Sequence, residues 1–194
     1  QNSGHEVILV SSGAIGLGMG KLGLRERPKD TPGKQACAAV GQCELMYLYD
    51  NLFAEYSISV AQMLLTKYVL LEDRRKNVEN AMERLISHRV IPVINENDTV
   101  AIDELELEVG ENDSLAAIVA DIAKADLLII MSDIDGLYDK DPHTYEDAKL
   151  IPVVHEITDE IKALAGGAGT KLGTGGMITK LNAVEIAYKS DIDV

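Results

Sequence analysis

The stretch VIPVINEND, residues 90–98, decides the fold. Its first five residues, 90–94, form a short apolar run without a charge, which predicts a buried strand. A charged amphipathic helix is predicted just before it, over residues 72–89, and polar residues follow it from Asn95 to Asp98. A helix followed directly by a buried strand fits an alternation of the two elements, which favours an α/β protein.

The same alternation of strand and helix extends outward in both directions. Further strands are predicted at residues 6–10, 57–65 and 126–133. The last of these, DLLIIMSD, is a continuous apolar run, as expected for a strand in the middle of a parallel sheet. Further helices are predicted from about Ala14, over 34–55, over 112–125 and from about residue 177. The two alternating runs of TVAIDELELEV, residues 99–109, indicate a hairpin. We therefore predict a doubly wound, mainly parallel sheet flanked by helices, with right-handed crossovers and a β-hairpin insertion.

The length of 194 residues suggests one domain with a real core. Residues 1–4 resemble the end of a helix and its turn, whereas residues 191–194 resemble the start of a strand. We expect a single domain over residues 1–194 that is incomplete at both ends, within a longer protein.

Composition excludes several classes of function. A formal net charge of −14 argues against a nucleic-acid partner, and no apolar run approaches the length of a membrane span. Cys37 and Cys43 lack the spacing of metal ligands and are interpreted as reduced packing residues. The four histidines are scattered, so no metal site made of side chains is predicted.

Polar residues follow each predicted strand, and in such folds ligands bind beyond the carboxyl ends of the strands. The groups are Ser11–Ala14, Asn95–Asp98, Asn112–Asp113, Ser132–Gly136 and Gly173–Lys180. Each has a plainer interpretation, such as a strand-to-helix turn, a solvated loop or a helix cap. Their convergence on one edge nevertheless favours a ligand site.

The stretch LGTGGMITKLNA, residues 172–183, leads from a glycine-rich run into an amphipathic helix. Thr174 or Gly175 is the expected N-cap, and the predicted apolar stripe is Met177, Leu181, Val184 and Tyr188. Free N–H groups at such a helix start attract anions, and a bound anion would also stabilise a lysine there. Neither the Walker A nor the dinucleotide pattern fits, because Ile178 stands where glycine is needed. A glycine-rich turn before an ordinary helix is the alternative.

The stretch DIDGLYDKDP, residues 133–142, superficially resembles a calcium loop. An EF-hand would require an oxygen ligand at position 137 and glycine at 138, where Leu137 and Tyr138 stand. The residues predict turns at Asp135-Gly136 and at Asp141-Pro142 instead.

Five segments together resemble the glutamate 5-kinases of the amino acid kinase family. They occur in the family's order: VSSGAIGLG, PVINENDTVAIDE, GENDSLAA, SDIDGLYDKDP and GTGGMITKLNAV. The fourth is shared across the wider family, whereas SSGAIGLG, NEND and GTGGMITK point to the glutamate 5-kinases. The likeness covers the chain from Glu6 onward.

The resemblance implies a role for each matching residue. Ser12, Asp98 and Asn112 match glutamate-binding positions, with Asp98 facing the ammonium group. Asp113 matches a residue that orients the active-site lysines, and Lys180 matches the lysine that reaches the phosphates. The implied ATP-binding residues are Ser132, Asp133, Thr174, Gly175, Gly176, Met177, Ile178, Thr179 and Lys180.

The implied reaction is phosphorylation of the γ-carboxylate of L-glutamate by ATP with Mg²⁺, at the entry to proline synthesis. Since that carboxylate is already ionised, no general base is needed, and electrostatic stabilisation becomes the main requirement. The resemblance also implies a cytoplasmic homo-oligomer. Members begin with a further lysine-bearing loop that has no counterpart in this sequence. An N-acetylglutamate kinase, or a non-catalytic sensor on the same fold, is the alternative.

Overall fold

The computed structural model describes residues 3–66, 69, 71–100, 112–165 and 176–194. The chain divides into two compact units, residues 1–107 and 108–194, which are described in turn. Within the described residues, no helix is both long enough and apolar enough to cross a membrane.

The first unit holds a parallel sheet of β1 (Leu9–Val10), β2 (Val60–Leu65) and β3 (Ile91–Glu96). Its order is β1-β3-β2, so the strand predicted from VIPVIN is central, and it is buried from Ile91 to Asn95. The helices are α1 (Ala14–Leu22), α2 (Thr31–Ala54) and α3 (Glu72–Ser87). The predicted α/β fold with a parallel sheet flanked by helices is confirmed.

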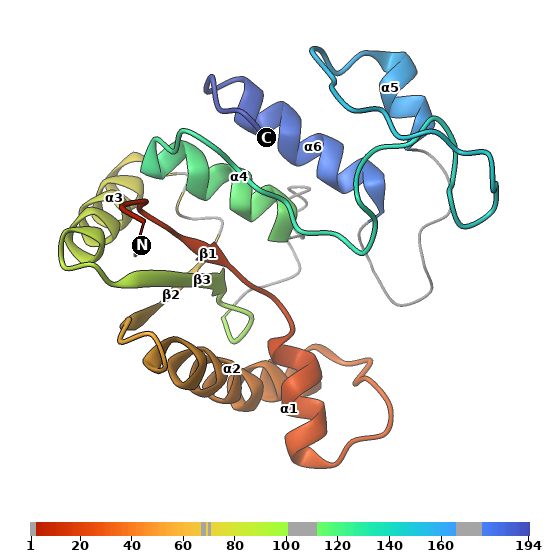
Figure 1. The fold of residues 1–194 in the computed structure, drawn as a ribbon. Coiled ribbons are helices and arrows are strands. Elements are labelled where there is room, and N and C mark those ends of the chain that lie inside the picture. The colour runs from red at the N-terminus through yellow and green to blue at the C-terminus, as the bar shows by residue number, and fades with distance from the viewer. Residues whose placement is uncertain (1–2, 67–68, 70, 101–111, 166–175) are drawn as a thin grey trace. The chain divides into compact units, whose positions relative to one another are not determined.

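This strand order determines where the helices lie. The chain moves two places across the sheet from β1 to β2 and one place back to β3. Right-handed crossovers in opposite directions place their helices on opposite faces of a sheet. In Figure 1, α2 lies below the strands and α3 above them.

Helices α1 and α2 pack backbone against backbone. A Cβ atom added at Gly18 would overlap the carbonyl oxygen of Cys37, and one added at Gly41 would overlap that of Ala14. Cys37 is buried, as predicted for a packing residue, whereas Cys43 is exposed, so the packing prediction is wrong for Cys43. The close approach fixes the position of α1, which begins at the carboxyl end of β1.

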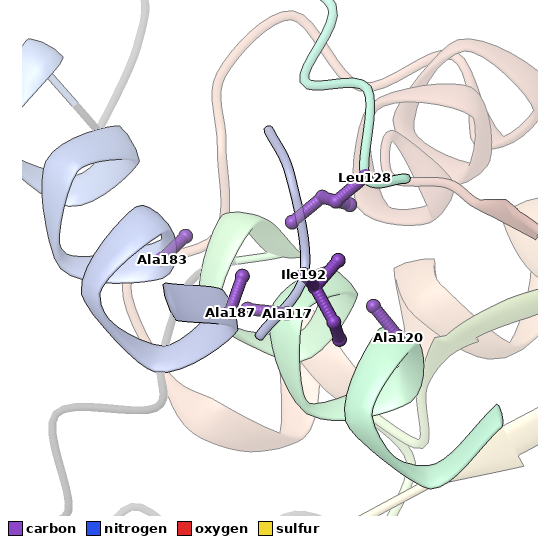
Figure 2. Packing of buried hydrophobic residues seen from close by; sticks show 6 residues of the cluster. All are labelled: Ala117, Ala120, Leu128, Ala183, Ala187 and Ile192. Carbon is purple, nitrogen blue, oxygen red and sulfur yellow. The ribbon is translucent and has the colours of Figure 1, made fainter. Parts of the chain in front are cut away.

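The second unit is built on α4 (Asn112–Ala123) and α6 (Met177–Tyr188). Figure 2 shows the alanine faces through which the two helices pack, together with Leu128 and Ile192. Hydrogen bonds join the helices at both ends, from Lys180 to Asp113 (3.0 Å) and from Ser190 to Asp121 (2.7 Å). The helices are therefore parallel, with their N-termini side by side.

A short helix that the sequence analysis did not predict, α5 (Asp159–Leu164), is capped by the Thr158 hydroxyl. Lys162 on α5 pairs with Glu185 on α6 at 2.6 Å. This ion pair ties α5 to the helix that carries Lys180.

The buried strand predicted at residues 126–133 is wrong for this structure. The segment makes a single parallel bridge, between Leu127 and Asp193, and Leu128 N donates to Asp193 O at 2.8 Å. Leu127, Ile129 and Met131 are 56%, 69% and 86% exposed. A strand depends on a ladder of hydrogen bonds to its neighbours, which hydrophobicity alone does not supply.

Two other expectations differ in detail. The first strand comprises only Leu9–Val10 of the predicted residues 6–10. On α6, Leu181, Ala183 and Ala187 are buried, whereas Tyr188 is 63% exposed, because the contact with α4 selects small residues. The predicted stripe is therefore wrong at Tyr188. The hairpin expected at 99–109 lies outside the described residues from 101 onward.

Candidate functional site

The carboxyl ends of β1 and β3 meet at one edge of the first unit's sheet. Val10 is paired with Ile94, and Ser11 N donates to Ile94 O at 2.8 Å. The SSGA turn and the NEND loop therefore leave the sheet side by side. The predicted convergence is confirmed for these two groups.

The turn after β1 presents a helix N-terminus at this edge. Gly13 is the N-cap of α1, with φ 94° and ψ 0°, a left-handed conformation that glycine adopts without strain. No side chain caps the helix, and its first turn carries no acidic residue. Ser12, directly before Gly13, is exposed. The first N–H groups of α1 and the Ser12 hydroxyl can therefore serve an anionic ligand.

Asp98 lies half-buried in the turn that follows β3, where Val100 N donates to Asn97 O at 3.0 Å. Burial raises the pKa of Asp98 above its ordinary value of 3.8, while the positive charge of Arg27 acts in the opposite direction. A carboxylate that has lost part of its solvation gains from a cationic partner. Asp98 is thus suited to bind an ammonium group.

In the second unit, Asp113 receives two side chains from the start of α6. Lys180 Nζ lies 3.0 Å from Asp113 Oδ2, and the exposed fractions of these side chains are 20% and 22%. The Thr179 hydroxyl oxygen lies 3.2 Å from the same carboxylate oxygen and 2.8 Å from Gly176 O. Asn112 precedes Asp113 as the first residue of α4. Lys180 and Asp113 are therefore in direct contact, and the roles that the resemblance implies for them stay predictions.

Helix α6 begins without a side-chain cap. Its N-cap is Gly176, in an extended conformation with φ −86° and ψ −170°, so the cap expected at Thr174 or Gly175 is wrong. Thr174 and Gly175 themselves lie outside the described residues. Its first turn contains no acidic residue, so the N–H groups at Met177 and Ile178 begin the helix unneutralised. Among the described residues, no side chain caps this start, as the sequence predicts.

Ser132 and Asp133 are exposed, and the Ser132 hydroxyl donates to Asp133 Oδ1 at 3.3 Å. In the loop that follows Asp133, two carboxylates accept hydrogen bonds from residues of the same loop. Tyr138 donates to Asp135 at 2.7 Å, and Asp141 accepts from His143 N and the Thr144 hydroxyl. The Thr144 hydrogen bond is the main reason why the pKa of Asp141 is lowered. These bonds agree with the predicted turns and leave the calcium interpretation without support.

The predicted residues thus fall into two groups. Ser12 and Asp98 belong to the first unit. The second unit holds Asn112, Asp113, Ser132, Asp133 and the described start of α6, from Gly176 to Lys180. The sequence analysis overlooked Gln42 and Tyr49, which α2 extends toward the sheet edge. The signal in the sequence that could have indicated them is their spacing, since two polar residues seven apart lie on the same face of a helix.

A sequence profile of the amino acid kinase family matches residues 1–194. The chain belongs to this family. Among its relatives, the glutamate 5-kinase of Clostridium perfringens is 54% identical over all of this chain and 73% of its own length. The glutamate 5-kinases of Caldanaerobacter subterraneus and Lactococcus lactis subsp. cremoris are 55% and 51% identical over 98% of this chain.

The chain spans 51% of the Caldanaerobacter enzyme and 72% of the Lactococcus enzyme. It therefore corresponds to between about half and three quarters of these relatives. Within the amino acid kinase family, its similarity is to the glutamate 5-kinases, as the sequence motifs indicated.

Proposed function

We propose that the protein containing this chain transfers the γ-phosphoryl group of ATP to the γ-carboxylate of L-glutamate. The product is glutamyl 5-phosphate, an acyl phosphate that enters proline biosynthesis. The observation that carries the proposal is the Lys180–Asp113 pair at a bare helix start, in a chain about half identical to glutamate 5-kinases along its whole length.

The first unit supplies groups suited to a free amino acid. Asp98 pairs with the ammonium group, because its partly buried carboxylate gains from a cation. Ser12 and the N–H groups of α1 donate to a carboxylate of the substrate. The resemblance implies that Asn112, in the second unit, also binds glutamate. An acetylated amino group carries no charge for Asp98, so this residue favours glutamate over N-acetylglutamate.

The second unit supplies groups suited to a phosphoryl group in transfer. The start of α6 donates backbone N–H groups, and Lys180 lies one turn behind them. Asp113 holds the ammonium group of Lys180 in place. It does not act as a general acid or base toward the substrate. Positive charge fixed in advance is what a transition state with spread negative charge requires. Ser132 and Asp133 contact the nucleotide in this proposal.

ATP in this reaction would be used with Mg²⁺, which when bound would neutralise part of the phosphate charge. No group of three metal-ligating side chains occurs in the described part of the chain. Mg²⁺ needs none, because it is usually bound through phosphates, water and one or two carboxylates. Asp133, an exposed carboxylate among the residues that contact the nucleotide in this proposal, would hold it. The cytoplasmic homo-oligomer implied by the resemblance stays a prediction.

The test is ADP release by the full-length protein with MgATP and either L-glutamate or N-acetylglutamate. We expect release with glutamate and little above background with the acetylated compound. Preference for N-acetylglutamate would reassign the chain to a sister kinase. Nucleotide binding without turnover on either substrate would favour a non-catalytic sensor.

A further inference from the structure

Helix α2 carries two polar side chains that no proposed binding role uses. Gln42 is 8% exposed, and Tyr49, seven residues later, is half-buried. A spacing of seven residues is two helical turns, so both project from the same face of α2. Each forms a hydrogen bond to the residue at which a strand gives way to a proposed glutamate-binding loop.

Gln42 bonds to the end of β3. Asn95 Nδ2 donates to Gln42 Oε1 at 3.0 Å, and Asn95 is 2% exposed. The other amide atom of Asn95, Oδ1, accepts from the backbone N–H of Glu96 at 2.9 Å. The amide of Asn95 therefore links α2 to the backbone where the NEND loop begins, three residues before Asp98.

Tyr49 bonds to the end of β1. Its hydroxyl lies 2.8 Å from Ser11 Oγ, and either oxygen can donate. Ser11 is buried, its N–H is bonded to Ile94 O, and it immediately precedes Ser12. The Tyr49 ring stacks on Phe53 at 6.4 Å, which restricts where the hydroxyl can lie. The bond therefore sets the position of the chain just before the SSGA turn.

Stability alone gives little reason for a glutamine at position 42. Gln42 Nε2 is buried and has no hydrogen-bond partner among the described residues. A buried donor without a partner lowers stability, and this cost offsets part of what the hydrogen bond to Asn95 contributes. A role in placing Asn95 accounts for the amide.

We propose that Gln42 and Tyr49 are positioning residues for glutamate, acting through Asn95 and Ser11 on the two loops that carry Asp98 and Ser12. This inference rests on the proposed glutamate kinase activity. Neither residue touches the substrate in this account. Each holds one loop from the side of α2, so loss of either bond loosens the glutamate site and leaves the phosphate-binding residues of the second unit unchanged.

The test compares Tyr49→Phe and Gln42→Met with wild type in the full-length protein. Tyr49→Phe keeps the stacked ring and removes only the hydroxyl. We expect the glutamate KM to rise about three- to tenfold in each variant, the fold-change that corresponds to one neutral hydrogen bond. The ATP KM and kcat should stay within about twofold of wild type, since no phosphate-binding group is altered. Tyr47→Phe is the matched control, because Tyr47 lies on α2 and is 62% exposed.

A double-mutant cycle separates positioning from a general loss of structure. If Tyr49 acts through Ser11, Ser11→Ala combined with Tyr49→Phe should raise the glutamate KM no more than the larger single effect. Gln42→Met removes the acceptor of the buried Asn95 Nδ2 atom, so its thermal midpoint should fall below that of wild type while the variant still folds. If Gln42→Met does not fold, Tyr49→Phe decides alone.

The possible outcomes separate this inference from the function on which it rests. A wild-type protein that does not phosphorylate glutamate overturns the proposed function. A wild-type protein that does so, with an unchanged glutamate KM in Tyr49→Phe, overturns the positioning role. An equal rise of both KM values would also overturn it, because that pattern indicates general damage.

Discussion

Lys180 Nζ lies 3.0 Å from Asp113 Oδ2, at the point where two parallel helices begin side by side. The alanine faces of α4 and α6 set this distance, because Ala117 and Ala183 are fully buried against their neighbours one turn away. A cation near a helix N-terminus is disfavoured by the helix dipole, and the Asp113 carboxylate offsets that effect. The pair thus keeps a lysine beside the first N–H groups of α6.

Replacing Lys180 by methionine retains the length of the side chain and removes its charge. If Lys180 stabilises the transferring phosphoryl group, kcat should fall about 100- to 1000-fold, or roughly 2.7–4 kcal/mol, by analogy with loss of one preorganised donor. ATP affinity should weaken much less, because the backbone N–H groups of α6 remain. Lys189→Met, at the exposed C-terminal end of the same helix, is the control and should behave as wild type. Unchanged kcat in Lys180→Met would exclude the catalytic role.

Replacing Asp113 by asparagine should act through Lys180. We expect a loss of kcat and a smaller change in either KM, since the lysine is no longer held by a charge. The double variant with Lys180→Met should lose no more than Lys180→Met alone, because the two residues form one unit. Asp126→Asn, an exposed site in the same unit, is the control. Strictly multiplicative losses would show that Asp113 acts independently of Lys180.

Replacing Asp98 by asparagine should raise the glutamate KM about 10- to 100-fold, which corresponds to the roughly 1.5–3 kcal/mol of a hydrogen bond to a charged group. The ATP KM should change little. Steady-state kinetics with each substrate varied in turn gives both values. Equal damage to both substrates would mean that the NEND loop has only a structural role.

Although Asp98→Asn should weaken glutamate binding, it should not lower the stability of the fold. Burial raises the pKa of Asp98, so the folded state binds its proton more tightly than the unfolded state does. Ionisation therefore costs stability, and this cost appears as the pH rises from about the ordinary value of 3.8 through the raised pKa. Asp98→Asn removes the cost, so its thermal midpoint at pH 7 should equal or exceed that of wild type. A clear decrease at pH 7 would show that the charged form stabilises the fold.

Two glycine substitutions test the packing that places α1. Gly41→Ala introduces a Cβ atom against the backbone of Ala14, so we expect a loss of about 1–3 kcal/mol in the free energy of unfolding. Gly20→Ala, on α1, has open space around the new atom and should gain about 0.5–1 kcal/mol. Denaturant unfolding of both variants gives the values. Equal effects would contradict the backbone-to-backbone contact.

The sequence predicted most elements whose hydrophobic pattern is determined locally. VIPVIN is a buried strand as expected, and α4 begins at Asn112 as predicted. DLLIIMSD shows the limit, since its apolar character was read correctly but Ile129 and Met131 are exposed. Whether such a run is a strand depends on neighbours that its own residues do not encode.

The candidate site was predictable where motifs are contiguous. Asp98, Asp113 and Lys180 each stand in a short signature, and the last two meet as expected. Gln42 and Tyr49 were overlooked because their significance arises from partners 53 and 38 residues away in the chain. No local pattern encodes contacts of that kind.

The most direct test of the account is to identify the product of the full-length protein with MgATP. Glutamyl 5-phosphate is an acyl phosphate, so hydroxylamine traps it as a hydroxamate. We predict hydroxamate with L-glutamate, formed in proportion to ADP and lost in Lys180→Met. ADP without hydroxamate, or hydroxamate formed preferentially from N-acetylglutamate, would contradict the proposed reaction.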